Sequence, residues 1–127
     1  MEKKFEIEIN TKLVVTAEDI DDIMCTALEG GITDWCGSAK VVGEHFGEYG
    51  HEQIARGGKL KLYDMVEDEE YELTCEDVLK GIKMAVEEGY YENYGWFTGN
   101  SLDTCNIDAE VADVIVQFAL FEEVIYG

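Results

Sequence analysis

The chain has 127 residues, 46% of them hydrophobic, which suits one folded domain over residues 1–127 and excludes a disordered acidic chain. Its 29 acidic residues stand against nine Lys and Arg, for a formal net charge of −20, and no Lys or Arg lies beyond Lys83. A surface of this sign repels nucleic acid and anionic membranes and attracts basic proteins, so we expect no direct binding to nucleic acid or membrane.

The N-terminal third is expected to form extended structure followed by a helix. Residues 4–10 alternate between apolar and polar side chains, which is the period of a half-buried strand, and residues 13–15 continue the extended structure. Thr16 and Asp19 have the spacing of a capping box, and apolar residues then recur at helical intervals. We expect this helix to end at the glycine pair 30–31.

The middle of the chain is expected to contain a β-hairpin. Residues 32–36 favour a short extended piece, and residues 48–56 favour a short helix that ends at a second glycine pair. Alternation over residues 59–63 and 70–73 predicts two antiparallel strands. The connection between them, residues 64–69, is acidic, and we expect it to be exposed.

Two more helices complete the predicted fold. Thr74 and Asp77 repeat the capping pattern before an apolar helical face, and Gly89 ends it. The last helix begins at about Asp108 and is strongly apolar, so we expect it to be the most buried element. These elements predict an α+β fold, with a small antiparallel sheet and about three to four helices packed on one face of it.

Catalytic motifs are absent from the sequence. The only histidines, His45 and His51, would not share a helical face, and there is no nucleophile elbow, phosphate-binding loop or dinucleotide fingerprint. We therefore expect that the protein is not an enzyme. A hydrolase that uses some of the many carboxylates is an open alternative.

The four cysteines are the candidate metal ligands. The chain begins without an apolar leader, and no run approaches the ~20 apolar residues of a membrane span, so we expect a cytoplasmic protein whose cysteines are thiols or metal ligands. Cys25 and Cys36 flank the chain reversal at residues 30–31, and Cys105 precedes the last helix, so these three can meet at a zinc ion. The candidates for a fourth ligand are His45, His51 and Cys75. The spacings match no standard zinc motif, and thiols that fill core space are the alternative.

Two acidic clusters are the candidate partner-binding residues. They consist of Asp19, Asp21 and Asp22 at the start of the first helix and Glu67, Asp68, Glu69 and Glu70 in the hairpin connection. Carboxylates on a rigid scaffold can take the positions of phosphates in a basic groove. The alternative is a solvated face, and for Asp19 an interaction with the helix dipole. Residues 89–97 mix aromatic residues with acids and glycines, which suits a protein interface if exposed.

Three stretches resemble a family of small acidic proteins encoded by phages and prophages of Gram-positive bacteria. They are TAEDIDDIMCTALEGGITDWC at residues 16–36, EQIARGGKL at 52–60 and NIDAEVAD at 106–113. The chain departs from the pattern at Asp34, where an aromatic residue is expected. The resemblance implies an anti-CRISPR protein that inhibits a type II, RNA-guided DNA nuclease, and this class includes a zinc-containing example.

The sequence therefore predicts an acidic protein of the bacterial host cytoplasm that binds a basic partner, which the resemblance identifies as a type II CRISPR effector nuclease. Such an inhibitor would block nucleic-acid loading or activation of the nuclease. The alternative is a phage structural or assembly protein that uses residues 89–97 as a protein contact.

Overall fold

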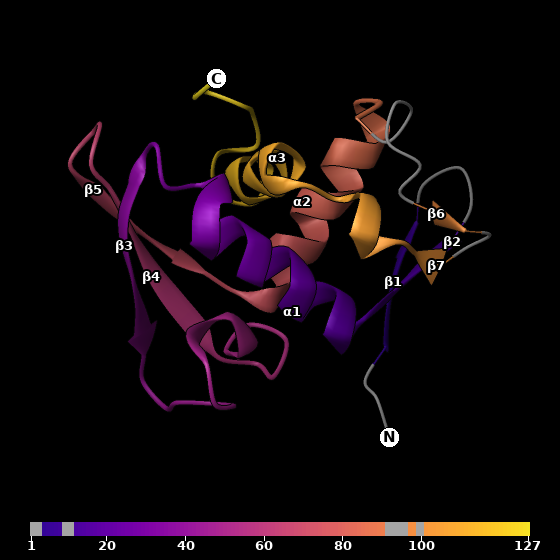
Figure 1. Ribbon diagram of the computed structural model, residues 1–127, viewed down its shortest axis with the longest axis horizontal. Coiled ribbons are helices and arrows are strands. Elements are labelled where there is room, and N and C mark those ends of the chain that lie inside the picture. The colour runs from indigo at the N-terminus through magenta and orange to yellow at the C-terminus, as the bar shows by residue number, and fades with distance from the viewer. Residues whose placement is uncertain (1–3, 9–11, 91–96, 99–100) are drawn as a thin grey trace.

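The computed structural model describes residues 4–8, 12–90, 97–98 and 101–127, and within them it is an α+β fold, as predicted (Figure 1). The elements in chain order are β1 (Lys4–Glu8), β2 (Lys12–Thr16), α1 (Ala17–Thr26), η1 (Ala27–Gly31), β3 (Cys36–Val42), η2 (Gly50–Glu52), β4 (Lys59–Asp64), β5 (Glu69–Leu73), α2 (Cys75–Glu87), β6 (Phe97–Thr98), β7 (Ser101–Leu102), η3 (Thr104–Asn106) and α3 (Ala109–Phe121).

The described strands form two small sheets where the sequence suggested one. The first has the order β1-β2-β7-β6, and the second is the antiparallel meander β3-β4-β5. In the first sheet, β2 pairs in parallel with β7, where Val14 lies opposite Ser101. Figure 1 shows the two sheets toward opposite ends of the long axis, with the three α-helices between them in this view. A single apolar cluster nevertheless joins both sheets to the helices.

The two predicted capping boxes are confirmed. The Thr16 hydroxyl accepts from the Asp19 amide at 3.1 Å, and the Asp19 carboxylate accepts from the Thr16 amide at 2.9 Å. Thr74 and Asp77 make the same two bonds at the start of α2, at 3.2 and 3.0 Å. Each box satisfies amides that the first helical turn would otherwise leave unpaired.

Helix α3 lies at the centre of the packing and is largely buried, as its composition predicts. Its buried residues are Val111, Ala112, Val114, Ile115, Val116, Gln117, Phe118 and Ala119. Helix α2 packs closely against it at Gly81, where any Cβ would overlap the backbone oxygen of Ile115 and lie 3.2 Å from the Ala119 side chain. Only glycine therefore permits this approach of the two helices.

Two short segments differ from the sequence prediction. Residues 32–35 are a turn, because the Trp35 and Cys36 amides both donate to the Ile32 carbonyl oxygen, at 3.1 and 2.8 Å, and β3 begins only at Cys36. Residues 48–56 contain the single 3₁₀ turn Gly50–Glu52 followed by further turns, and a longer helix does not form. Glycines at 47, 50 and 57 favour these turns, since Gly47 and Gly57 adopt positive φ angles of 76° and 93°.

The aromatic segment predicted as an interface lies mostly outside the described residues, which omit 91–96. Gly89 ends the preceding helical stretch with a φ of 87°, as predicted. Tyr90, which is half-buried, packs edge-on against Phe118 of α3 with ring centroids 5.9 Å apart. Tyr90 therefore packs against the hydrophobic core. The exposure of residues 91–96 stays untested.

Candidate functional site

The carboxylates of the acidic cluster at the start of α1 bond mainly to other residues of the same chain. Asp19 belongs to the capping box of Thr16. Asp21 accepts from the Arg56 guanidinium at 3.0 and 3.2 Å, and Asp22 accepts from the Thr104 hydroxyl at 2.8 Å. These carboxylates connect α1 to the segment after η2 and to η3, so they are less available to a partner than free carboxylates.

The second acidic cluster lies at the end of the β4–β5 hairpin and is open to solvent. All four of its residues are exposed: Glu67, Asp68, Glu69 and Glu70. Among the ion pairs of the described residues, none involves a member of this cluster. Asp68 accepts from the Tyr63 hydroxyl at 2.7 Å and has a φ of 57°, a left-handed conformation that Asp tolerates better than most residues. This cluster is therefore more accessible to a binding partner than the acidic cluster at the start of α1.

Asp64 is an exception to the prediction that the whole hairpin connection is exposed, since its exposed fraction is 0%. It continues the alternation of Leu60 and Leu62, so the register of β4 directs it inward. Its Oδ1 accepts from the amides of Val66 and Glu67, at 2.9 and 3.1 Å. A buried carboxylate is stable only with such partners, and here they fix the start of the acidic turn.

The other oxygen of Asp64 binds the C-terminal segment. Tyr126 donates its hydroxyl hydrogen bond to Asp64 Oδ2, and this bond, with partial burial and the nearby negative charges, raises the pKa of the Tyr126 phenol above its ordinary value. The Tyr126 ring stacks on Trp35 with centroids 5.4 Å apart and meets Phe121 edge-on. The C-terminal segment therefore connects the helical core to the acidic hairpin.

A buried amide holds this segment against α3. Gln117, with an exposed fraction of 0%, accepts from the amides of Ile125 and Tyr126 at 2.9 Å and donates to the Tyr126 carbonyl oxygen at 3.0 Å. It also donates to Asp113 Oδ1 at 3.0 Å, and the same oxygen accepts from the Trp35 indole at 2.7 Å. A polar residue inside an otherwise apolar helical stretch is the sequence feature that indicates such a network, and Gln117 is not among the predicted site residues.

The predicted zinc ligands do not come together as a set of three. Cys25 and Cys105 line one pocket of about 260 Å³, next to the Asp22–Thr104 hydrogen bond. Cys36 is not among the residues of that pocket; it is buried at the start of β3, and its thiol donates to the Ser38 carbonyl oxygen at 3.3 Å. Among the described residues, which include every Cys and His of the chain, no group of three or more His, Cys, Asp or Glu can hold a metal ion. Cys25 and Cys105 are thus brought together without Cys36, and zinc binding by this protein stays a prediction.

The surroundings of Cys25 and Cys36 favour the protonated thiol over the thiolate. Burial raises the pKa of Cys25, and the neighbouring carboxylates of Glu29 and Asp22 raise it further. Burial also raises the pKa of Cys36, although backbone hydrogen bonds partly oppose the shift. Of the candidate fourth ligands, His45 is exposed, His51 stacks on Tyr49, and Cys75 lies at another pocket.

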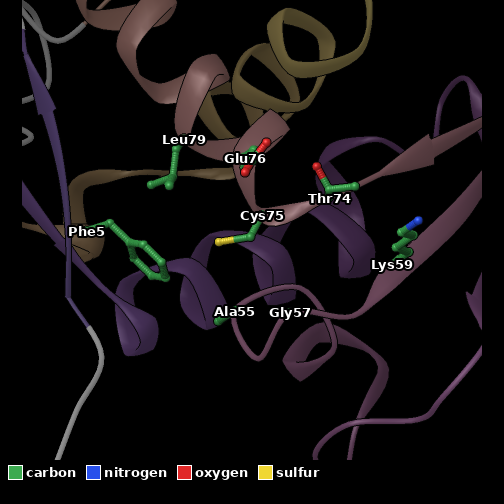
Figure 2. A pocket seen from close by; sticks show the side chains of 8 residues that line it. All are labelled: Phe5, Ala55, Gly57, Lys59, Thr74, Cys75, Glu76 and Leu79. Carbon is green, nitrogen blue, oxygen red and sulfur yellow. The ribbon is translucent and has the colours of Figure 1, made fainter.

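This other pocket, of about 530 Å³, lies between β1, the N-terminus of α2 and the segment before β4 (Figure 2). Its lining residues are Phe5, Ala55, Gly57, Lys59, Thr74, Cys75, Glu76 and Leu79. Figure 2 shows the Cys75 sulfur directed toward the Phe5 ring. Lys59 forms an ion pair with Glu72 at 3.8 Å. The lining is mixed, since apolar side chains such as Phe5 and Leu79 lie beside the charged Lys59 and Glu76.

Comparison of the chain with models of protein families, with curated proteins and with solved structures gives no match. Within the described part of the chain, every helix is too short or too polar to cross a bilayer.

Proposed function

We propose that this protein is an inhibitor that binds a basic nucleic-acid-binding protein through its acidic surface. The observation that carries the proposal is the exposed run Glu67–Glu70, whose side chains are outside every ion pair of the described residues. In a chain of net charge −20, this run protrudes at the end of a hairpin, where a basic groove can reach it.

The partner is a type II CRISPR effector nuclease in the bacterial cytoplasm, as the sequence resemblance implies. Such nucleases hold nucleic acid in positively charged channels and read a short DNA motif with arginines. A folded acidic body seated there excludes guide RNA or DNA by occupying the positions of their phosphates. Bound instead to a basic lobe, it blocks the conformational step that permits cleavage.

The test compares binding of two variants to a type II nuclease at low and at high salt. The first carries Glu67→Gln, Asp68→Asn, Glu69→Gln and Glu70→Gln. The control carries Glu44→Gln, Glu87→Gln, Glu88→Gln and Glu123→Gln, which remove the same charge from other exposed positions. We expect the first variant to lose about tenfold or more in affinity and most of the salt dependence, since specific charge pairs dominate over net charge at short range. Equal losses in the two variants would leave net charge alone as the cause, and unchanged inhibition by the folded first variant refutes the proposal.

A further inference from the structure

Two apolar side chains are exposed at the tip of the acidic hairpin. Met65 is 47% exposed and Val66 is 58% exposed, and the acidic run Glu67–Glu70 follows them directly. Single exposed hydrophobic residues are ordinary on protein surfaces. Two consecutive ones on a protruding turn, with four carboxylates beside them, instead have the composition of an interface centre with a polar rim.

The turn that carries these two residues is fixed by its neighbours. The Met65 amide donates to the Trp35 carbonyl oxygen at 2.9 Å, and the Val66 amide donates to the buried Asp64. On the other side of the turn, Asp68 accepts from the Tyr63 hydroxyl. Because the backbone is already ordered, the tip would lose little conformational entropy when a partner binds it.

We propose that Met65 and Val66 are the apolar anchor of this surface, and that the partner offers an apolar recess ringed by lysine and arginine. The inference rests on the proposed function and specifies the partner's surface. Charge complementarity selects this occupant, since the carboxylates that flank the anchor need cations opposite them. A second copy of the chain is disfavoured, because two such tips would bring eight carboxylates together.

The two kinds of residue would then have separate effects on binding. The carboxylates speed the encounter and make it sensitive to salt. The apolar pair slows dissociation by burying surface that water otherwise covers. A partner that offers positive charge but no apolar recess would therefore associate fast and also dissociate fast.

Two synthetic peptides of equal length and charge separate these effects. One alternates lysine with leucine and the other alternates lysine with serine, and each is titrated with the full-length protein by fluorescence anisotropy. We expect the lysine–leucine peptide to bind about tenfold more tightly, as burial of the anchor side chains requires. Val66→Ser should remove most of this preference and leave the affinity for the lysine–serine peptide unchanged.

The matched control is Ile125→Ser, because Ile125 is 45% exposed and lies outside the hairpin. Equal affinity of the native protein for both peptides, or equal effects of Val66→Ser and Ile125→Ser, would overturn the proposal that Met65 and Val66 anchor the partner. Charge-driven binding that survives in those cases, and that neutralisation of residues 67–70 abolishes, would leave the proposed function standing. If neutralisation of residues 67–70 leaves the binding of both peptides intact, the proposed function fails as well.

Discussion

Substitution of Gln117 by methionine tests how the C-terminal segment is held. Methionine fills nearly the same volume but removes four hydrogen bonds, and three of them join α3 to the backbone of Ile125 and Tyr126. A net hydrogen bond contributes ~1 kcal/mol, and a buried group left unpaired costs ~1–3 kcal/mol. The segment can also detach and let water satisfy its amides, which limits the loss to that of its contacts with Trp35, Phe121 and Asp64. We therefore expect a decrease of about 2–4 kcal/mol in the free energy of unfolding.

Urea unfolding followed by fluorescence measures this decrease as a lower midpoint with an unchanged m-value. The same substitution is then made in a Tyr126→Ala background, where the segment has already lost its ring contacts. If Gln117 acts through the segment, its substitution costs clearly less there, because the two residues belong to one network. A loss below about 0.5 kcal/mol in the native background, or the same loss in both, would refute the reasoning.

Three further predictions concern other parts of the molecule. Gly81→Ala should destabilise the protein by about 2 kcal/mol or more in urea unfolding, because a Cβ there meets the backbone of α3, whereas Gly30→Ala, where a Cβ meets open space, should change stability by less than about 0.5 kcal/mol. Because the pKa of Tyr126 is raised in the folded state, its contribution to stability is complete below the ordinary tyrosine pKa of about 10 and is lost as the pH rises through the folded value. Tyr126→Phe should therefore flatten the alkaline decline in unfolding free energy, and an unchanged decline would show that another group causes it. Any zinc found by elemental analysis should be lost in a folded Cys25→Ser variant and retained in Cys36→Ser, because Cys25 shares a pocket with Cys105, whereas Cys36 is buried and donates to the Ser38 carbonyl oxygen; the reverse pattern would contradict this placement.

Local signals in the sequence predicted local structure well. The caps at Thr16 and Thr74 and the hairpin around residues 64–69 depend on residues within a few positions of one another, so composition and spacing suffice. The pairing of Val14 with Ser101 joins positions far apart in the chain through a single parallel contact, which no periodicity records. The division of the strands into two sheets was therefore beyond sequence reasoning.

The candidate site was predicted in part. The exposure of the acidic run followed from its position in a connection, but Asp64 was grouped with that run although the alternation from Leu60 extends to it. The importance of the C-terminal segment depends on Tyr126, whose partners Asp64 and Trp35 are distant in sequence. Only the polar Gln117 within an apolar stretch indicated that a buried network was needed there.

The charges of β5 have a second consequence, for the behaviour of the protein in solution. This strand is at the edge of the sheet β3-β4-β5, and edge strands pair readily with strands of other molecules. The exposed Glu69, Glu70 and Glu72 place repelling charges along that edge, which disfavours the pairing of this strand with the same strand of another molecule. The surface proposed to attract a partner thus also protects the free protein from aggregation, and variants that neutralise it should be handled at low concentration and checked for size before binding is measured.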